Sequence, residues 1–319
     1  MRDWGPDGRG RSAWGRGHVL AALAVLVAWL VVFHGTVPDL PGRPGSLIET
    51  FLPWLGLAVP VLLAAALLRR SATALLALVL PVVAWLGHFG AALPPGDAPG
   101  PYDLVAVQHN VSDENPDPAG TVRALTRARP DLIALEELTP AALPAYAAAL
   151  AADYPHHAVH GTVGLWSRHP LSDVRELDIR PDGVGAGWNR GMRATAATPH
   201  GEVAVLVAHL PSVRLGLGGG FGTGRRDQSA ALLGAAIGAE KLDRLLLLGD
   251  LNGTVDDRGL GPVGSRMDPV PADFAFSWPA SAPVARIDHV MARGATITRI
   301  RSLPRTGSDH LPVVAYVRF

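Results

Sequence analysis

Three apolar segments between residues 18 and 93 constrain this chain more than any other feature of its sequence. They read HVLAALAVLVAWLVVFH (18–34), FLPWLGLAVPVLLAAALL (51–68) and TALLALVLPVVAWLGHFGAAL (73–93), and none contains Lys, Arg, Asp or Glu. A helix needs about 20 apolar residues to cross the hydrocarbon core of a bilayer. Residues 18–93 are therefore predicted to form three transmembrane helices.

A signal peptide and a buried helical bundle are the two alternatives to membrane spans. A cleaved signal peptide accounts only for the first segment, and no Ala-x-Ala-like cleavage site stands out after it. A buried helical bundle accounts for all three segments, and Pro53 and Pro60 interrupt the second. Because membrane helices tolerate such prolines better than soluble helices do, the sequence favours membrane spans.

Basic residues beside the apolar segments predict their orientation, because short flanks rich in Lys and Arg stay in the cytoplasm. Four arginines precede the first segment, namely Arg2, Arg9, Arg11 and Arg16, and two, Arg69 and Arg70, lie between the second and third segments. The connection between the first two segments contains only one, Arg43. The tail, residues 1–17, is therefore predicted to be cytoplasmic. Three crossings then place the rest of the chain outside the plasma membrane.

A Pro/Gly linker, PPGDAPGP (94–101), leads into residues 102–319, which are long enough for one well-cored extracytoplasmic domain. This part holds 21 Lys and Arg against 23 Asp and Glu. It lacks the net positive charge expected of a non-specific nucleic-acid-binding protein, so charge argues against nucleic acid as a partner. The chain has no cysteine, which is compatible with an exported position.

Short apolar runs recur through residues 102–319 and are typical of buried strands. Examples are DLVAVQHN, DLIALEEL, EVAVLVAHL, RLLLLGDLN and LPVVAYVRF. A few helical stretches separate them, chiefly PAGTVRALTRARP, PAALPAYAAALAA and RRDQSAALLGAAIGAE. Many strands with few helices favour an α+β sandwich with helices on its outer faces over a regular doubly wound sheet.

Polar side chains stand where several of these strands end, namely Asn110, Glu136, Glu137, His209, Asp250, Asn252, Asp288, His289, Asp309 and His310. Each alone has a purely structural interpretation. GDLNG has the composition of an ordinary turn, a glutamate at a strand end is often a surface residue, and a lone histidine is often a satisfied core residue. Asp288 could simply pair with Arg286 or Arg301. Loops at strand ends are nevertheless where a rigid sheet presents catalytic groups.

Taken together, these motifs resemble the endonuclease/exonuclease/phosphatase superfamily of metal-dependent phosphoesterases, from about Val105 to the C-terminus. The matching motifs are HN, PDLIALEELT, GLWSRHPL, VAHL, GDLN, RIDHV and GSDHLPV, in the family's order and approximate spacing. The resemblance implies a DNase I-like four-layered α/β/β/α sandwich, here preceded by three transmembrane helices. The membrane-anchored arrangement further resembles actinomycete VanJ-type proteins associated with teicoplanin resistance, through architecture and composition more than through any motif.

The resemblance also implies a divalent metal site. Glu137 and Asp309 are the implied metal ligands, and Asn110 would touch the metal or the phosphate. Oxygen ligands suit Mg²⁺, the expected cofactor, with Mn²⁺ as the alternative. Glu136 stands where the family usually has Gln and is a weaker candidate. Ser112 stands where some family nucleases have an acid, which leaves the number of metals open.

The same resemblance assigns roles in phosphoester hydrolysis to five residues. Asp250 would orient or deprotonate the attacking water, and Asn252 would hold that water or a phosphate oxygen. His310, oriented by Asp288, would contact the scissile phosphate. His209 would act as a general acid or bind a phosphoryl oxygen.

Arg190 and Arg193 are weaker candidates for phosphate binding. A guanidinium can grip two phosphate oxygens, but strand arginines are more often solvated surface residues. Neither is part of a motif that the resemblance covers.

The predicted location of residues 102–319 outside the membrane narrows the range of expected substrates. A nearly neutral domain held just outside the membrane favours hydrolysis of a lipid-linked phosphate or pyrophosphate, and the VanJ-type resemblance suggests undecaprenyl pyrophosphate, with a role in the cell wall and in antibiotic resistance. One alternative is an exported, membrane-tethered nuclease, against which the absent positive charge counts. Another is a non-catalytic membrane sensor or scaffold, which the retained site residues argue against and Ser112 leaves open.

Overall fold

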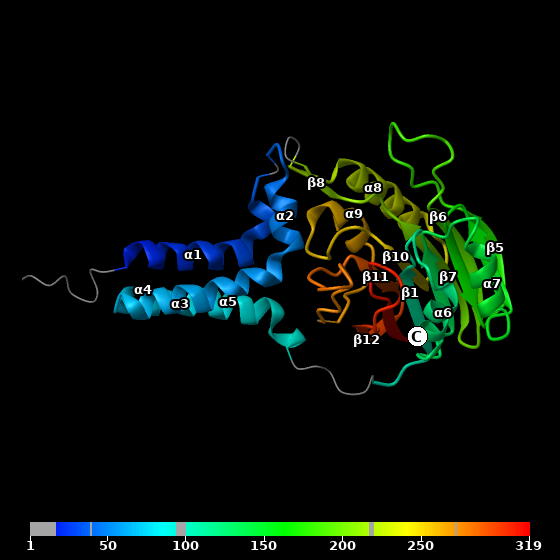
Figure 1. Cartoon of the computed structure of the whole chain (residues 1–319), viewed down its shortest axis with the longest axis horizontal. Coiled ribbons are helices and arrows are strands. Elements are labelled where there is room, and N and C mark those ends of the chain that lie inside the picture. The colour runs from blue at the N-terminus through cyan, green and yellow to red at the C-terminus, as the bar shows by residue number, and fades with distance from the viewer. Residues whose placement is uncertain (1–16, 39, 94–99, 217–219, 272) are drawn as a thin grey trace, which may run out of the picture. The chain divides into compact units, whose positions relative to one another are not determined.

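The computed structural model describes residues 17–38, 40–93, 100–216, 220–271 and 273–319. Residues 1–16 of the predicted cytoplasmic tail and residues 94–99 of the predicted linker lie outside this part of the chain. By internal packing the chain divides into two compact units (Figure 1), one formed by Met1–Pro38 and Phe51–Leu93, the other by Asp39–Thr50 and Pro94–Phe319. The second unit is thus built from two separate stretches of sequence.

The first unit consists of apolar helices. They are α1 (His18–Phe33), η1 (His34–Thr36), η2 (Leu52–Leu57), α3 (Ala58–Leu68), α4 (Ala72–Ala77), α5 (Val79–Phe89) and η3 (Gly90–Ala92), where η denotes a 3₁₀ helix. Small and branched residues, including Ala24, Ala66 and Ala74, form its interior. Many large apolar side chains, such as Val19 and Leu68, stay exposed, as expected of helices whose outer surface faces lipid.

Two of these helical stretches, His18–Thr36 and Ala72–Ala92, are long and apolar enough to cross a membrane. A third span exists if Pro44–Thr50 and Leu52–Leu68, which meet at a bend of 77°, count as one. Pro53 lies at the start of η2 and Pro60 in the first turn of α3. The first turn of a helix needs no amide donor, so both prolines are compatible with helix here.

The second unit contains two large sheets and a small hairpin. The first sheet has the order β12-β13-β1-β2-β4-β3 and the second β11-β10-β7-β6-β5, while β8 and β9 form a two-stranded hairpin. The strands are β1 (Leu104–Asn110), β2 (Leu132–Glu136), β3 (His156–His160), β4 (Val163–Ser167), β5 (Leu171–Glu176), β6 (Gly191–Thr198), β7 (Gly201–His209), β8 (Arg214–Gly216), β9 (Gly220–Gly222), β10 (Leu245–Asp250), β11 (Asp288–Arg293), β12 (Thr296–Ser302) and β13 (Val313–Arg318).

Successive side chains of a strand point to opposite faces of its sheet, and in this unit apolar side chains on both faces form three apolar layers. The central layer joins the inner faces of the two sheets and includes Ala106, Leu165, Val205, Leu248 and Val313. The outer face of each sheet is equally apolar, with Ile133 on the first and Leu247 on the second. The central strands of both sheets are therefore buried on both sides, whereas the edge strand β5 is largely exposed.

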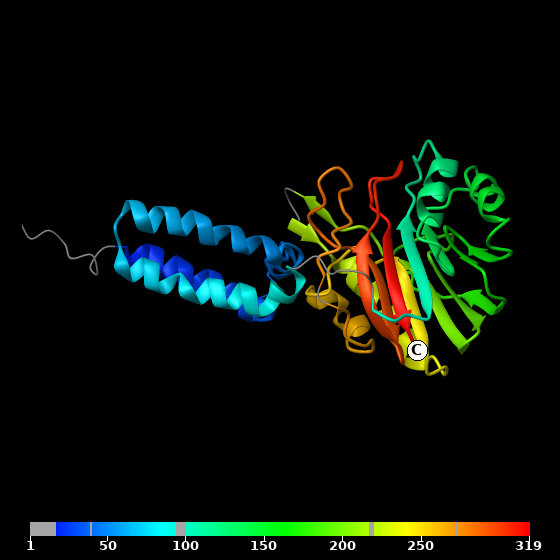
Figure 2. The same cartoon turned by 90° about the horizontal axis from the view of Figure 1, so that it is seen from below.

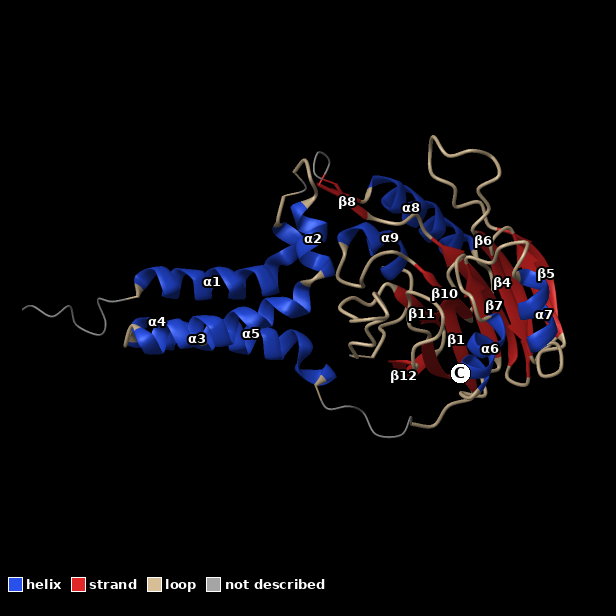
Figure 3. Ribbon diagram, viewed as in Figure 1, coloured by secondary structure: helices blue, strands red, loops and turns tan. Residues whose placement is uncertain are grey.

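Helices cover those outer faces. The unit contains α2 (Pro44–Thr50), α6 (Pro118–Thr126), α7 (Leu143–Leu150), α8 (Gly224–Ala239), η4 (Arg258–Leu260) and α9 (Gly261–Gly264). Leu125 of α6 and Leu150 of α7 pack on the first sheet, whereas Leu233 of α8 and Val263 of α9 pack on the second. Figures 2 and 3 show the sheets between these helices. The predicted four-layered α/β/β/α sandwich is confirmed.

Candidate active site

Strand register gathers the polar strand ends at one end of the sandwich. In the second sheet, Asp250 of β10 lies directly opposite His209 of β7 on one side and Asp288 of β11 on the other. In the first sheet, Asn110 of β1 lies opposite Glu136 of β2. Because β1 and β2 are parallel, and β7 and β10 are parallel, each pair of strands ends at one edge of its own sheet. The hydrogen bond from Asn110 Nδ2 to Asp250 Oδ2, at 3.1 Å, joins these two edges.

Asp288 and His310 form a buried pair. His310 Nδ1 lies 2.8 Å from Asp288 Oδ2, and neither side chain is more than 8 % exposed. Although burial opposes the charge, the carboxylates of Asp288 and Asp250 raise the pKa of His310 to about 10. Burial likewise acts against ionisation of Asp288, but His310 holds its pKa at about 2. The pair is therefore an imidazolium held by a carboxylate, with Nε2 turned toward Asp250.

Hydrogen bonds fix this pair from both sides. Gln108 Nε2 donates to Asp288 Oδ1 at 3.0 Å and also to Glu136 Oε2 at 2.8 Å. The hydroxyl of Ser308 accepts from the backbone N–H of His310 at 3.0 Å and donates to the carbonyl of Asn110 at 2.7 Å. Such supporting contacts hold the imidazolium ring in one orientation.

Asp250 is the central carboxylate of the site and is only 1 % exposed. It accepts hydrogen bonds from the side chain of Asn110 at 3.1 Å and from the backbone N–H of Asn252 at 2.9 Å. Burial raises the pKa of Asp250 to about 7, against the opposing charge of His310. A carboxylate with such a pKa is suited to accept a proton near neutral pH.

Glu137 and Asp309 line a pocket of about 400 Å³ together with Ser112, Asp113, Glu114, Arg305, Gly307 and Ser308. Glu137 follows β2 with φ 59°, a left-handed backbone that turns its carboxylate out of the sheet edge. Its Oε1 accepts from Asn110 Nδ2 at 3.1 Å and its Oε2 from the Asp113 N–H at 3.2 Å. An acidic pocket with oxygen donors from two separate loops fits a hard divalent cation.

Asn110 connects this pocket to Asp250. Its amide nitrogen donates to both Glu137 and Asp250, while its oxygen accepts from the N–H of Ser112 at 3.0 Å. In this arrangement the amide nitrogen of Asn110 orients the two carboxylates. A second group within the described residues could also hold a metal: ligand atoms of Asp250, Asp288 and His310 lie within 4.8 Å of one another.

His209 is buried and uncharged in the structure. Its Nε2 lies 3.6 Å from Asp250 Oδ2 and 3.8 Å from Glu137 Oε1. Burial, together with the positive charges of Arg190 and His310, holds its pKa well below the usual value. A neutral imidazole can donate one hydrogen bond to a phosphoryl oxygen but has no extra proton to give as a general acid.

Arg190 is the candidate arginine that reaches the site. Its Nη1 lies 3.3 and 3.4 Å from the two ring nitrogens of His209, and its guanidinium lies 5.3 Å from the centre of the Trp188 ring. Burial lowers the pKa of Arg190, and the negative charges of Glu137, Asp250 and Asp113 oppose that shift. Arg190 therefore places a cation beside the carboxylates of the site.

Arg193 is not brought to the site, which corrects its inclusion among the phosphate-binding candidates. Its neighbours Met192 and Ala194 face the central core, so alternation turns Arg193 to the outer face of the sheet. There Nε donates to Glu240 at 3.0 Å and Nη1 to Asp173 at 2.6 Å. The side chain is 5 % exposed and serves a buried ion pair.

Asn252 occupies a tightly held turn directly after β10. Its φ is 49°, its side-chain nitrogen donates to the Leu210 carbonyl at 3.0 Å, and its own carbonyl accepts from Arg226 Nη1 at 3.1 Å. The next carbonyl, that of Gly253, lies 2.8 Å from His289 Nε2. His289 therefore supports the turn instead of facing the site.

Sequence reasoning missed Gln108 and Arg226 and gave Glu136 little weight. Gln108 could have been found from its place two residues before Asn110, which puts both side chains on the same face of β1. Glu136 is completely buried, and burial raises its pKa well above the usual value, so it takes the place of a neutral amide beside Gln108. Arg226 lies in a glycine-rich stretch with no motif, and no local signal pointed to it.

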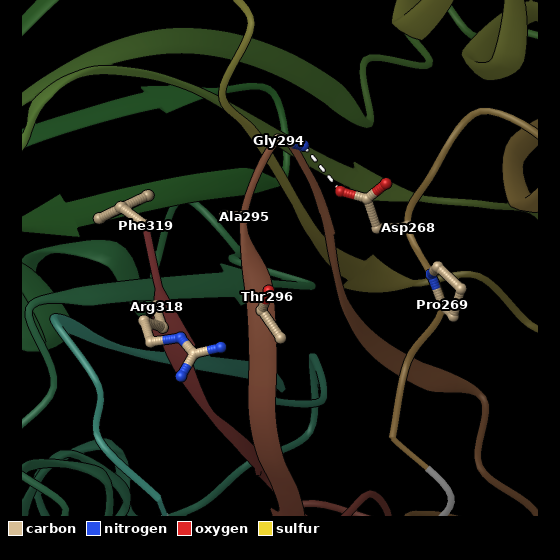
Figure 4. A pocket seen from close by; sticks show the side chains of 7 residues that line it. All are labelled: Asp268, Pro269, Gly294, Ala295, Thr296, Arg318 and Phe319. Atoms are coloured by element: carbon tan, nitrogen blue, oxygen red, sulfur yellow. Dashed lines mark hydrogen bonds between the residues drawn. The ribbon is translucent and has the colours of Figure 1, made fainter.

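A second pocket, of about 520 Å³, lies at the other end of the sandwich (Figure 4). It is lined by Asp268, Pro269, Gly294, Ala295, Thr296, Arg318 and Phe319, and Asp268 accepts from the N–H of Gly294 at 2.8 Å. β11 and β13 run from the site end toward this pocket. None of the candidate site residues lines it.

Comparison with known protein families agrees with the geometry of the site. The sequence profile described as the Endonuclease/Exonuclease/phosphatase family matches residues 107–310. The chain belongs to this family. The matched range runs from β1 to His310 and includes every candidate residue of the site.

Solved structures show the same fold at low sequence identity. TDP2 of D. rerio, complexed with a single-strand DNA product, is 16 % identical with a TM-score of 0.54, and sphingomyelinase C of Streptomyces griseocarneus is 18 % identical with a TM-score of 0.50; each match covers 68 % of this chain and 99 % of the other. Beta toxin of Staphylococcus aureus with bound magnesium ions is 14 % identical over 67 % of this chain and 99 % of its own, with a TM-score of 0.53. A search of curated protein sequences found no match.

Proposed function

We propose that this protein is a membrane-anchored, Mg²⁺-dependent phosphoesterase that hydrolyses a lipid-linked phosphate or pyrophosphate at the outer face of the plasma membrane. The observation that carries the chemistry is the cluster of Asp250, Asp288 and His310 beside the acidic pocket of Glu137 and Asp309. It supplies a base, a fixed cation and hard oxygen ligands within one site. Family membership supports phosphoester hydrolysis as the reaction class.

The residues of the pocket fit Mg²⁺, with Mn²⁺ as the alternative. Glu137 and Asp309 would hold the ion, and Asn110 would keep Glu137 in place through its amide nitrogen. When bound, the ion would neutralise charge on the phosphoryl oxygens. The magnesium ions in the similarly folded beta toxin support this choice.

Side chains of the protein would accept the proton of the attacking water and stabilise the charge on the phosphoryl oxygens. Asp250, with its pKa near neutrality, would accept the proton of the attacking water, and Asn252 would hold that water or a phosphate oxygen. The imidazolium of His310 would donate a hydrogen bond to a phosphoryl oxygen and stabilise the charge that develops there. His209, being neutral, would bind a second oxygen instead of protonating the leaving group.

Arg190 would provide a further phosphate contact. Among the described residues its guanidinium hydrogen-bonds through Nη1, toward His209, so Nε and Nη2 have donors left for a ligand. A pyrophosphate carries a second phosphoryl group that needs such a cation. This favours a substrate with two linked phosphates over a phosphodiester that has no second charged group.

The membrane location rests on the apolar helices and the basic flanks. Two helices meet the length and hydropathy of a span, and a bent pair offers a third. With three spans, residues 1–17 would be cytoplasmic, 18–93 would hold the spans, 94–101 would form a linker and 102–319 would lie outside the cell. A site held there meets lipid carriers of the cell wall, and the VanJ-type resemblance suggests undecaprenyl pyrophosphate and glycopeptide resistance.

The test is release of inorganic phosphate by the full-length protein in detergent, with Mg²⁺ or with EDTA, for wild type and Asp250→Asn. The substrates are undecaprenyl pyrophosphate, sphingomyelin and plasmid DNA, and the two lipids are presented in the same mixed micelles. Cleavage of the two phosphodiesters, sphingomyelin and DNA, is measured through their own reaction products. Release from the pyrophosphate, lost in EDTA and in Asp250→Asn, is expected. Faster cleavage of plasmid DNA would establish a tethered nuclease, and inactivity on all substrates with an intact Asp250→Asn cellular phenotype would favour a sensor.

Orientation needs a separate test, because an inverted chain would expose the site to the cytoplasm. Fusion of alkaline phosphatase to Phe319 is expected to be active, and fusion of a fluorescent protein at the same position is expected to be dark. The opposite result would exclude the cell-wall substrate while leaving the hydrolytic chemistry intact.

A further inference from the structure

Residues 40–50, which lie in the sequence between the first two apolar segments, pack as part of the catalytic unit. We call them the 40–50 segment; it contains α2 (Pro44–Thr50). Ser46, Glu49 and Thr50 are buried although the segment is short. The segment contacts the β8–β9 hairpin, where the N–H of Phe221 donates to the carbonyl of Gly42 at 2.9 Å, and the turn that begins at Asn252.

Glu49 makes the first group of contacts. Its side chain is 0 % exposed and accepts from Arg258 Nη2 at 2.8 Å, from Arg258 Nε at 2.9 Å and from the Arg258 backbone N–H at 3.0 Å. The carbonyl of Glu49 accepts from the hydroxyl of Thr254 at 3.2 Å. Gly45 lies flat against the same guanidinium, where a Cβ would come within 2.6 Å of Arg258 Nη2. A side chain on Gly45 would therefore displace the ion pair.

Arg43 makes the second group through a chain of ionic contacts. Arg43 Nη1 donates to Asp227 Oδ2 at 3.0 Å, and Asp227 Oδ1 accepts from Arg226 Nε at 2.8 Å. The fully buried Arg226 then donates to the carbonyl of Asn252 at 3.1 Å and to Asp257 at 2.8 Å. The chain of contacts connects Arg43 to a residue of the active-site turn.

The turn needs such support because its backbone is strained. Asn252 holds φ 49°, a left-handed conformation that residues other than glycine seldom adopt and that surrounding contacts help to maintain. Gly253 follows with no room for a side chain, since a Cβ there would meet Arg226 Nη1. Thr254, Asp257 and Arg258 complete the turn, and the 40–50 segment or its partners bind all three.

We propose that the 40–50 segment is a positioning element of the active site, which holds the turn of Asn252 so that the side chain of Asn252 is aligned for phosphoester hydrolysis. The proposal rests on the proposed function in that Asn252 takes part in the chemical step. Glu49 and Arg43 touch neither substrate nor metal and act through Thr254, Arg258 and Arg226. The hydrolase site is thus completed by the loop that joins two predicted membrane spans.

The test uses the full-length protein in detergent with bis-p-nitrophenyl phosphate, a diester that reports on the site whatever the lipid substrate is. Glu49→Gln keeps the volume of the side chain but removes its charge, and Arg43→Ala is a milder change at a partly exposed position. We expect kcat to fall about 10- to 100-fold in Glu49→Gln, the size usual for residues that orient catalytic groups. KM should change by less than about twofold, because the turn acts in the chemical step.

Glu240→Gln is the matched control. Glu240 is also a buried carboxylate paired with an arginine, Arg193, and it lies on the outer face of the sheet. Glu240→Gln should lower Tm as much as Glu49→Gln does and should leave kcat per folded molecule unchanged. Glu49→Asp, which keeps the charge, should recover part of the lost kcat. Wild-type kcat in both Glu49→Gln and Arg43→Ala, or a loss no larger than that of the control, would overturn the proposal.

Hydrogen exchange separates failure of this proposal from failure of the proposed function. Backbone amides of residues 251–258 should exchange faster in Glu49→Gln than in wild type and Glu240→Gln, even if no substrate is ever hydrolysed. Unchanged exchange in that range would show that the segment does not hold the turn. Faster exchange in an enzyme inactive on all substrates would keep the positioning role and reject the hydrolase.

Discussion

The second unit contains two clusters of charged side chains that differ in how the charges are compensated. In the outer ion-pair cluster (Asp173, Arg175, Arg193 and Glu240), each carboxylate meets a guanidinium. In the site cluster (Glu137, Asp250, Asp288, Asp309 and His310), His310 is the protonated partner of Asp250 and Asp288, whereas His209, which approaches Asp250 and Glu137, is uncharged. One cluster is complete as folded, while the other leaves carboxylates that a cation would still stabilise.

Backbone conformation does not separate the two clusters. Positive φ occurs in both, at Glu137 of the site cluster (59°) and at Asp173 of the outer ion-pair cluster (44°). The difference lies in the charges, because uncompensated carboxylates are a feature that selection for stability alone would remove. The following predictions test this difference in charge compensation.

The largest effect should come from removing divalent cations. EDTA should abolish phosphate release, and Mg²⁺ should restore it, because the acidic pocket of Glu137 and Asp309 would need a bound cation to compensate its charge. Mg²⁺ should also raise Tm, since it binds the folded state only. Phosphate release and a thermal shift assay check the two effects. Full activity in EDTA would show that the protein itself compensates the charges of the site cluster, as it does those of the outer ion-pair cluster.

Replacing the central carboxylate should be nearly as severe. Asp250→Asn should lower kcat about a thousandfold, the range expected for loss of a general base. Its Tm should be equal or higher, because the change removes a buried charge held next to Asp288 and His209. Steady-state kinetics and thermal unfolding measure both. A strongly lowered Tm would mean that Asp250 is structural, like the carboxylates of the outer cluster.

Breaking the outer cluster should have the reverse effect. Arg193→Ala should lower the free energy of unfolding by about 3 kcal/mol, because it leaves Glu240 buried without its main partner. Urea unfolding measures the loss, and kcat per folded molecule should stay at the wild-type value. An equal fall in kcat would make Arg193 a phosphate-binding candidate again.

The smallest effect should be a pH dependence confined to the outer cluster. Burial opposes ionisation of Glu240, but hydrogen bonds from Arg193 lower its pKa from 4.5 to about 2. The folded-state pKa lies below the unfolded value, so Glu240 stabilises the fold above about pH 4.5 and loses this contribution as pH falls toward 2. Urea unfolding from pH 5 to 2.5 should therefore show a shallower slope for Glu240→Gln than for wild type. Identical slopes would indicate that Glu240 is not ionised in the native state.

The sequence predicted an α+β sandwich because its strands are many and its helices are few. Local pattern also showed that polar residues stand where several strands end. Family resemblance, and not local pattern, indicated that these residues form one site and that Asp288 pairs with His310, which the structure shows at 2.8 Å.

Other features depend on packing that no local pattern reveals. Arg193 could have been excluded by the alternation of Met192, Ala194 and Ala196, all buried, which turns it outward. The contacts of Glu49 and Arg43 could not have been predicted, because their partners lie far along the chain and carry no motif. The helix Pro44–Thr50 before the second apolar segment was not predicted either, and it meets the helix Leu52–Leu68 of that segment at a bend of 77°.

The order of synthesis gives the 40–50 segment a further consequence. Glu49 and its partner Thr254 are 205 positions apart. At the usual elongation rate of about 5–20 residues per second, Glu49 leaves the ribosome roughly 10–40 s before Thr254 does. Under the proposed topology, the segment would lie between two apolar helices that enter the bilayer during that interval, so the proposed hydrolase site would be completed only after their insertion. A nascent chain whose 40–50 segment stayed on the cytoplasmic side would then carry an unsupported active-site turn.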